Sequence, residues 1–235
     1  MIKVLLVEDD PVIARIISFY LKQESHYEVV CATTGGEAFS HSREQFDVIL
    51  LDVLLPDVNG IDLCAKLREW HNCPIIFISA LDNSETIVTA LEAGGDDFIT
   101  KPFDNKVLAA HIEANIRRAN QIQPDYYNST LVCEGFSFDR SKSMVIKDDQ
   151  LIKLSPQEAR ILALFMNNPN RFFSADEIYK RIWERESYGD TRSVVVHIHN
   201  IRKKIGDNDD PRFIKNIWGK GYIFDPTGKK GIQEL

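Results

Sequence analysis

Several carboxylates stand where short apolar runs of the sequence end. Glu8, Asp9 and Asp10 follow the first run, and Asp52 follows a later one. Carboxylates that meet at one place repel each other unless a cation lies between them. Mg²⁺ suits such a set, because it takes oxygen ligands and accepts phosphate oxygens as well. An aspartate such as Asp52 can then attack a phosphoryl donor and form an acyl phosphate.

A hydroxyl and an ammonium group follow two further apolar runs. Ser79 ends the fourth run, and Lys101-Pro102 ends the fifth. The Lys101 ammonium and a bound metal would stabilise negative charge on the transferring oxygens. Each feature alone has an ordinary explanation, since acidic pairs cap helices and Lys-Pro forms turns. Their placement after successive strands favours one shared site.

The elements that would position these residues alternate along the first half of the chain. Five βα units in a row predict a parallel sheet with helices on both faces. The site of such a sheet lies at the carboxyl ends of its strands, near the switch in strand order. Apolar runs are found at 3–7, 28–31, 47–51, 74–78 and 98–100, and helix-period segments at about 11–24, 35–45, 60–71, 84–93 and 105–119.

The charge of the chain is divided unevenly between its halves. The net charge of −7 argues, taken alone, against a nucleic-acid partner. Residues 1–120 carry 10 Lys and Arg against 19 Asp and Glu, whereas residues 121–235 carry 18 against 16. An acidic half joined to a mildly basic half predicts two domains with separate roles. We expect them at 1–120 and 131–226, with a polar linker at 121–130 and a tail at 227–235.

The second domain is predicted to mix strands and helices. Short strands are expected around 131–138 and 143–153, and a closing pair at 213–217 and 221–224. Two S-x-x-E capping boxes, beginning at Ser155 and Ser174, mark helix starts. The closing pair flanks Trp218-Gly219-Lys220, a glycine-shaped tip with a cation, which is typical of a wing that reaches a DNA minor groove.

A third helix, expected from about Thr191 to Ile205, has one apolar face. Val194, Ile198, Ile201 and Ile205 have helical spacing and predict a buried stripe. The rest fits a DNA major groove, where Lys and Arg bind phosphates and Asn can pair with an adenine edge. An ordinary amphipathic helix with a solvated basic face is the alternative. The DNA-facing surface is expected to carry Arg192, Ser193, Val196, His197, His199, Asn200, Arg202, Lys203 and Lys204, with Lys220 on the wing.

The first half resembles the receiver domain of two-component response regulators. The resemblance rests on Val7-Glu8-Asp9-Asp10, the stretch 51–60, Ser79-Ala80 and Lys101-Pro102-Phe103, and it spans residues 1 to about 120. It implies that Asp52 takes its phosphoryl group from a sensor histidine kinase. It further implies Mg²⁺ held by Glu8 or Asp9, Asp52 and the Leu54 carbonyl, phosphoryl contacts from Ser79 and Lys101, a cis Lys101–Pro102 peptide, and Phe98 at the position of the aromatic switch residue.

Another class of aspartyl-phosphate protein fits the sequence poorly. Phosphatases and ATPases of the haloacid dehalogenase type place a second aspartate two residues after the phosphorylated one. Here that position is Leu54.

The second half resembles the winged-helix domain of the OmpR/PhoB type over about 131–226. The matching segments are 154–158, 174–183, 192–198, 201–204 and 219–222. The resemblance implies a transcription regulator, not an enzyme, that binds direct-repeat half-sites on double-stranded DNA as a head-to-tail dimer. Arg192, His197, His199 and Arg202 would contact phosphates, Val196 and Asn200 would lie nearest the bases, and the loop 184–190 would be a candidate contact for RNA polymerase. Val195 and Trp218 depart from the family pattern, so its DNA sequence rules do not transfer.

The interface through which activated receivers of this family pair also departs from the pattern. Glu92, Asp97 and Arg118 fit the usual charged set, but Ile87 and His111 replace two common cations. Exposed ion pairs contribute only about 0–1 kcal/mol each, so homodimerisation on activation could rest on apolar contacts. A regulator that works without phosphorylation, as a constitutive dimer or ligand sensor, is the main alternative. A signalling adaptor that does not bind DNA is a weaker one, given the basic helix and wing.

The remaining features predict a cytoplasmic protein. The four cysteines have no C-x-x-C spacing and are expected to be reduced. The amino terminus lacks a signal peptide, and no apolar run approaches the roughly 20 residues of a membrane-spanning helix.

Overall fold

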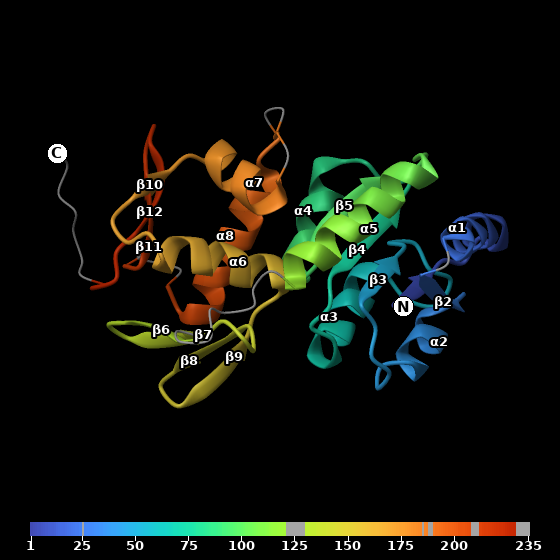
Figure 1. Ribbon diagram of the computed structural model, residues 1–235, viewed down its shortest axis with the longest axis horizontal. Helices are drawn as coiled ribbons and strands as arrows, with labels where there is room; N and C mark the ends of the chain where they lie inside the picture. The colour runs from blue at the N-terminus through green and yellow to red at the C-terminus, as the bar shows by residue number, and fades with distance from the viewer. Residues whose placement is uncertain (25, 121–129, 185, 188–189, 208–211, 229–235) are drawn as a thin grey trace. The chain divides into compact units, whose positions relative to one another are not determined.

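The computed structural model describes residues 1–24, 26–120, 130–184, 186–187, 190–207 and 212–228. The chain divides into two compact units, residues 1–120 and 121–235 (Figure 1). The predicted linker lies almost wholly outside the described residues, as does most of the predicted tail. None of the helices in the described ranges is both long and apolar enough to cross a membrane.

The first unit contains a five-stranded parallel sheet in the order β2-β1-β3-β4-β5. β1 therefore has neighbours on both sides, and the chain reverses its direction of winding between β1 and β3. This is the switch point at which parallel sheets bind ligands. The elements are β1 (Ile2–Val7), α1 (Pro11–Gln23), β2 (Tyr27–Ala32), α2 (Gly35–Ser40), β3 (Val48–Leu51), α3 (Gly60–Trp70), β4 (Ile75–Ser79), α4 (Ser84–Glu92), β5 (Asp97–Thr100) and α5 (Asn105–Asn120).

Both faces of this sheet are buried. Leu6 and Leu50 pack with residues of α1 and α5 in one apolar cluster. Their neighbours Leu5 and Ile49 pack with residues of α2, α3 and α4 in another. Because successive side chains of a strand point to opposite faces, a continuous apolar run supplies both clusters.

Short polar side chains fix where the helices begin. The Asp10 carboxylate accepts the backbone N–H groups of Val12 and Ile13 and caps α1. Asn59 caps α3 in the same way through Ile61. Asp10 is thereby committed to the helix, which leaves Glu8 and Asp9 as the acidic pair at the end of β1.

The second unit opens with four strands, two in each of the two stretches where the sequence predicted short strands. β6 (Thr130–Cys133), β7 (Phe136–Asp139), β8 (Met144–Lys147) and β9 (Gln150–Lys153) form an antiparallel meander. The turn between β8 and β9 is Asp148-Asp149, and both residues have positive φ, at 49° and 61°. Two-residue hairpin turns require this backbone, but Asp-Asp is a weaker signal for one than Asn-Gly or Asp-Gly.

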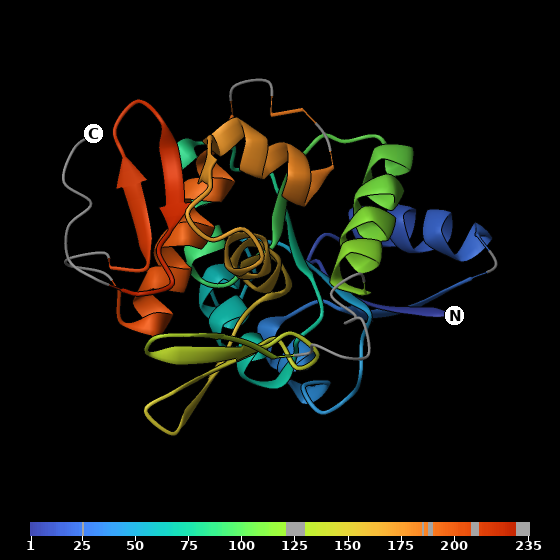
Figure 2. The ribbon, with the colours of Figure 1, turned by 60° about the vertical axis from the view of Figure 1, so that its left-hand side comes forward.

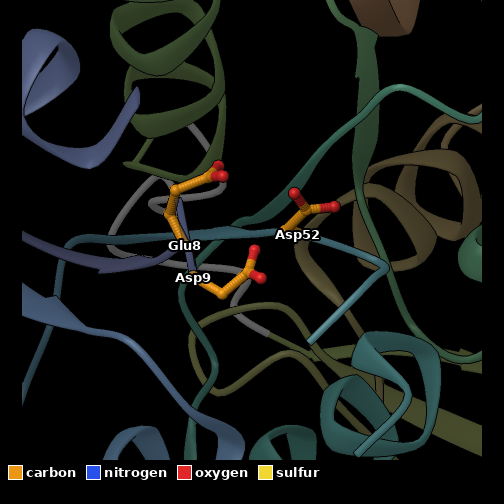
Figure 3. A group of neighbouring side chains, drawn as sticks. All are labelled: Glu8, Asp9 and Asp52. Atoms are coloured by element: carbon orange, nitrogen blue, oxygen red, sulfur yellow. The ribbon is translucent and has the colours of Figure 1, made fainter. Parts of the chain in front are cut away.

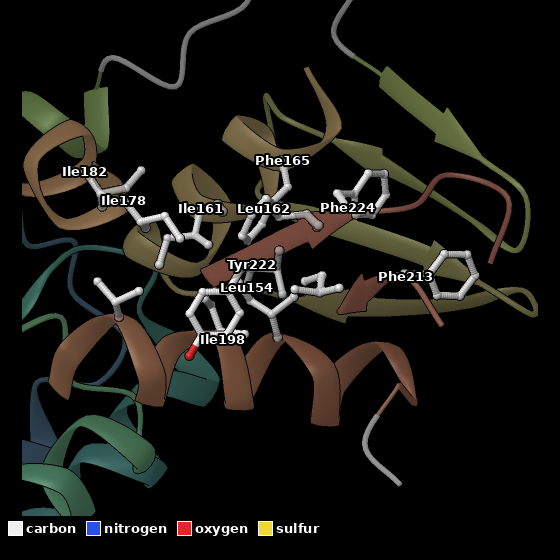
Figure 4. Close-up of a cluster of buried hydrophobic side chains, with 14 of the residues drawn as sticks. Leu154, Ile161, Leu162, Phe165, Ile178, Ile182, Ile198, Phe213, Tyr222 and Phe224 are labelled. Atoms are coloured by element: carbon white, nitrogen blue, oxygen red, sulfur yellow. The ribbon is translucent and has the colours of Figure 1, made fainter. Parts of the chain in front are cut away.

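Helices and a second small sheet complete this unit. Ile198 of α8 faces side chains of α6 and β12 in the buried cluster (Figure 4). Figure 2 shows β11 and β12 as a hairpin whose strands lie side by side. The elements are α6 (Pro156–Met166), β10 (Phe172–Phe173), α7 (Ala175–Trp183), α8 (Arg192–Ile205), β11 (Ile214–Ile217) and β12 (Gly221–Phe224), and the sheet order is β10-β12-β11.

The predicted fold class is confirmed. A doubly wound parallel sheet is followed by an α+β unit in which three helices precede a β-hairpin wing. The predicted capping box at Ser155 is present, with the Ser155 N–H donated to the Glu158 carboxylate. β10 was not predicted, because two residues are too few to give a periodic signal.

Candidate functional site

Three carboxylates gather at the carboxyl ends of β1 and β3. One oxygen of each of Glu8, Asp9 and Asp52 lies within 4.8 Å of the others. Figure 3 shows their side chains turned toward a common space. Glu8 and Asp52 are buried, at 1% and 5% exposure, whereas Asp9 is open to solvent. The set therefore combines two desolvated carboxylates with one that water can reach.

An ammonium group from the end of β5 joins two of these carboxylates. Lys101 Nζ lies 2.5 Å from Asp52 Oδ2 and 2.9 and 2.7 Å from the two Glu8 oxygens. Burial raises the pKa of Glu8, and the bonds from Lys101 only partly oppose this rise. Burial also acts to lower the pKa of Lys101, but the bonds to Asp52 and Glu8 outweigh it and raise the pKa above its usual value. Lys101 is thus held as a cation between two buried acids.

The loop after β3 is shaped around Asp52. The Leu54 N–H is donated to Asp52 Oδ1 at 3.1 Å, and the Gly60 N–H is donated to the Val53 carbonyl at 2.8 Å. A Cβ on Gly60 would lie 1.9 Å from the Asp52 carbonyl oxygen, so a glycine is required by this close approach. Asp57, in the same loop, accepts the N–H groups of Gly35 and Gly36 at the start of α2.

Ser79, Phe98 and the Lys101–Pro102 peptide are the further predicted features in the neighbouring strands β4 and β5 and the turn that follows β5. Ser79 is fully buried at the end of β4, and its oxygen accepts the Leu81 N–H at 3.3 Å. Phe98 is half-buried and stacks on Phe77, with ring centroids 6.1 Å apart. The predicted cis peptide at Lys101–Pro102 is confirmed.

The second unit presents a narrow exposed strip along α8. Val195 is 50% exposed, and His199 and Lys203 are exposed on the same side of the helix. These positions are four residues apart and so form one line. The opposite side carries Val194, Ile198, Ile201 and Ile205, which belong to the core cluster as predicted.

The two units match known families separately. The model of the response regulator receiver domain matches residues 4–113, and that of the C-terminal domain of transcriptional regulatory proteins matches residues 149–224. The transcriptional regulatory protein YcbL of Bacillus subtilis, described as uncharacterized, is 34% identical over 222 residues, covering 93% of this chain and 98% of YcbL. The alkaline phosphatase synthesis transcriptional regulatory protein SphR of Synechococcus elongatus is 36% identical over 232 residues, covering 94% of this chain and 90% of SphR.

The chain is a response regulator of the OmpR/PhoB type. It combines a receiver domain with a winged-helix domain and belongs to a family of transcriptional regulatory proteins. A solved structure of a RitR mutant shares the fold, with a TM-score of 0.79 at 24% identity, covering 96% of this chain and 99% of that one.

Two predicted DNA-contacting cations of the response regulator are bound inside its winged-helix domain. Arg202 donates from Nε and Nη2 to the Ile214 carbonyl at 2.9 and 2.7 Å, and burial lowers its pKa. Lys204 Nζ lies 2.6 Å from the buried Glu158 carboxylate. The expectation that both are open to DNA is wrong, because these long side chains reach hydrogen-bond acceptors on other elements of their own domain.

The expectation that His197 lies on the outer surface of α8 is also wrong. Its side chain is fully buried and its ring lies 5.7 Å from the ring of Trp183, a core residue. His197 is three residues after Val194 and four before Ile201, so the helical period places it on the core side. His197 was predicted to face outward because histidine is polar, although its position in the helical period indicated the core side.

Val196 and Asn200 are 5% and 7% exposed and so are less open than the sequence suggested. Neither belongs to the core cluster, and the helical period places both away from the Val194 side. That they lie nearest the bases stays a prediction. Arg192 and Ser193 are half-exposed, and the Arg192 guanidinium bonds to Asp190, which raises its pKa.

The predicted dimer surface also contains buried charges. His111 Nδ1 lies 2.9 Å from Asp97 Oδ2, which accepts Asn115 Nδ2 at 3.0 Å as well. Asp97 and Arg118 are 5% and 2% exposed, so they are not the open surface charges that the sequence suggested. Ile87 is half-buried and Glu92 exposed. Their part in pairing stays a prediction.

Two features of the DNA-binding unit were missed by sequence reasoning. Val195 was noted only as a departure from the family pattern, although it is 50% exposed and begins the exposed strip of α8. Its spacing from His199 and Lys203 was the available signal. The Lys204–Glu158 pair joins residues 46 positions apart, and no local pattern could have indicated it.

Proposed function

We propose that Asp52 accepts a phosphoryl group from a sensor histidine kinase and that this modification controls DNA binding. The observation that carries the proposal is the placement of Lys101 Nζ at 2.5 Å from Asp52 Oδ2, among buried acids at the sheet's switch point. An isolated carboxylate is a weak nucleophile whose reaction brings more negative charge into the site. A fixed cation offsets that charge without moving during the reaction.

The donor set fits Mg²⁺. It consists of carboxylate oxygens, and the exposed Asp9 side of the cluster leaves room for the waters that Mg²⁺ keeps. Asp9 and Asp52 would hold the ion, with the Leu54 carbonyl as a further oxygen ligand. Both Glu8 oxygens face Lys101, so Glu8 is the acid that orients the lysine. When bound, Mg²⁺ supplies Lewis-acid stabilisation of phosphoryl oxygens.

The chain's own residues divide the remaining work. A carboxylate oxygen of Asp52 attacks phosphorus, and the bond from phosphorus to the kinase histidine nitrogen breaks as the new P–O bond forms. Lys101 exchanges part of its contact with Asp52 for a phosphoryl oxygen. The Ser79 oxygen already accepts the Leu81 N–H, so its own hydrogen can be donated to the phosphoryl group. Phe98 lies on the neighbouring strand β5, where it pairs with Phe77, two residues before Ser79, and would respond to phosphorylation as the aromatic switch residue.

The output of this switch is transcription control from DNA. Phosphorylation would favour a receiver conformation that self-associates through the surface of Ile87, Glu92, Asp97, His111 and Arg118. Paired winged helices would bind direct-repeat half-sites in the cytoplasm, with α8 in the major groove and Lys220 on the wing. The loop 184–190 is the candidate contact for RNA polymerase; residues 185 and 188–189 of it lie outside the described residues.

Native mass spectrometry after incubation with acetyl phosphate and Mg²⁺ tests the proposal. The wild type should gain one phosphoryl adduct, and Asp52→Asn should gain none. Asp57→Asn is the matched control, because this nearby aspartate is committed to the α2 backbone and its change should leave uptake intact. Continued uptake by Asp52→Asn would refute the assignment. An adduct without dimers would move control to interdomain release, and no adduct from acetyl phosphate or a kinase would favour the phosphorylation-independent regulator.

A further inference from the structure

The tip of the β11–β12 hairpin exposes a tryptophan completely. Trp218 is 97% exposed, whereas Trp183 is 2% and Trp70 is 49% exposed. A large aromatic side chain is normally covered over much of its surface by its own fold. An indole held fully in water at the end of a hairpin is therefore a candidate contact with another molecule.

The hairpin backbone holds Trp218 away from the domain. The Lys220 N–H is donated to the Ile217 carbonyl at 3.0 Å, and Gly219 takes a φ of 72° in the left-handed region, which closes a tight turn. At the base, a Cβ on Gly221 would lie 2.2 Å from the Phe173 carbonyl oxygen, so the hairpin is packed closely on β10. The tip is thus presented on a fixed support.

The hairpin is also fastened to α8. Arg202 connects α8 to β11, because two of its nitrogens donate hydrogen bonds to the Ile214 carbonyl. Its guanidinium carbon also lies 5.9 Å from the centre of the Tyr222 ring on β12. A helix and a wing joined in this way approach a ligand as one body. A ligand bound by the exposed strip of α8 would therefore also be contacted by the tip of the β11–β12 hairpin.

The charge of the hairpin indicates what that ligand is. The stretch 212–224 contains no acidic residue, and Arg212 and Lys220 are its exposed cations, since the Lys215 ammonium is buried against Asp225. Lys220 is exposed two residues from Trp218, with its ammonium 5.5 Å from the Phe172 ring centre. An exposed aromatic side chain beside a cation suits a polyanion that also offers flat apolar surfaces. Double-stranded DNA combines both properties.

We propose that Trp218 enters the minor groove and inserts its indole as a wedge between adjacent base pairs. This rests on the proposed function, since it requires the winged-helix unit to dock on DNA. An inserted side chain partly unstacks a base step and kinks the duplex. Steps that unstack readily, such as TA, should therefore be preferred over stiff A-tracts. The wing would read DNA by its deformability, in addition to any bases that α8 contacts.

Two polymers of equal composition and charge test the wedge. Poly(dA-dT) consists of alternating steps that include TA, whereas poly(dA)·poly(dT) is a continuous A-tract. At low salt, full-length wild type should prefer the alternating polymer. Trp218→Ala should lose about tenfold or more of its affinity for that polymer, the usual effect of losing one base–aromatic stack, and little for the A-tract. Lys203→Met is the control, and it should weaken binding to both polymers alike.

Tryptophan fluorescence supplies a second readout. In a Trp70→Phe background, buried Trp183 and exposed Trp218 are the tryptophans that remain. The part of the emission that Trp218→Ala removes should be quenched at saturation with poly(dA-dT), because stacking on bases quenches indole. Unchanged emission, or Trp218→Ala binding the alternating polymer as tightly as wild type, would overturn the wedge while DNA binding stands. Failure of every variant, wild type included, to bind either polymer would overturn the proposed function itself. Since Trp218 is exposed, Trp218→Ala should show the same thermal unfolding as its parent protein.

Discussion

Two adjacent lysines of α8 should have different roles, and a matched pair of substitutions separates them. Lys204 Nζ lies 2.6 Å from the Glu158 carboxylate, whose side chain is 1% exposed. Breaking a buried ion pair by removing one partner costs about 3–5 kcal/mol. The lysine side chain is itself 30% exposed and the Ser155 N–H still bonds Glu158. We therefore expect Lys204→Met to cost about 2 kcal/mol.

Hydrogen–deuterium exchange of the peptide covering α6 measures this loss. A destabilisation of about 2 kcal/mol should speed the exchange of its protected amides roughly 30-fold when exchange requires opening of the domain. Lys203→Met is the control, because Lys203 is exposed on the outer strip of the same helix. Its exchange should match that of the wild type.

Titration of DNA affinity against salt gives the reverse pattern. Loss of one phosphate contact reduces the slope of log affinity against log salt by about 0.9. Lys203→Met should show this reduction, whereas Lys204→Met should keep the wild-type slope because its ammonium is neutralised by Glu158. Equal slopes for the two variants, or unchanged exchange in Lys204→Met, would refute the assignment.

Two further predictions concern the receiver loop and the wing. Gly60→Ala puts a methyl group 1.9 Å from the Asp52 carbonyl oxygen, so we expect about 1–3 kcal/mol of destabilisation. A displacement of a reacting group by about 1 Å can lower a rate about 100-fold. We therefore expect a comparable fall in the rate of phosphoryl uptake, measured by quench-flow. Gly36→Ala, whose nearest contact is an ordinary 3.5 Å, should leave both unchanged, and similar behaviour of the two variants would contradict this reasoning. Asp225 is buried, which acts to raise its pKa, but the bonds from Lys215 and Thr227 lower the pKa below its ordinary value. Its stabilising effect is present above about pH 4 and disappears as the pH falls through its folded-state pKa, so the exchange difference between wild type and Asp225→Asn should shrink on acidification.

The receiver site could be predicted because topology alone gathers it. Glu8, Asp52 and Lys101 each end a strand, and all strands of a parallel sheet end at one edge. Their convergence needed no knowledge of side-chain packing. The role of Gly60 was different, since its requirement comes from a carbonyl oxygen of Asp52 that only the folded loop brings close. The proposed difference in role between Glu8 and Asp9 likewise depends on the position of Lys101 in the folded site.

On α8 the period of the sequence was reliable and the residue types were misleading. The apolar stripe predicted the core side correctly, but His197 was assigned outward although it lies between Val194 and Ile201 on that side. Arg202 and Lys204 point into the domain because other elements supply their acceptors, a carbonyl for Arg202 and a carboxylate for Lys204. A long cationic side chain at the edge of a core can reach either DNA or its own domain, and the sequence of the helix does not distinguish the two.

In the described part of α8 and the wing, the DNA-binding unit has few free cations with which to bind DNA alone. With Arg202 and Lys204 bound internally and Arg192 paired with Asp190, the cations left on the described surface of α8 and the wing are few, chiefly Lys203 and Lys220. Because DNA affinity rises steeply with the number of phosphates neutralised, one unit should bind weakly. A second linked unit makes its contacts at high effective concentration and can raise affinity about 10²–10⁴-fold without new chemistry. Weak single-unit binding would therefore give the proposed phosphorylation-driven pairing its control over DNA occupancy.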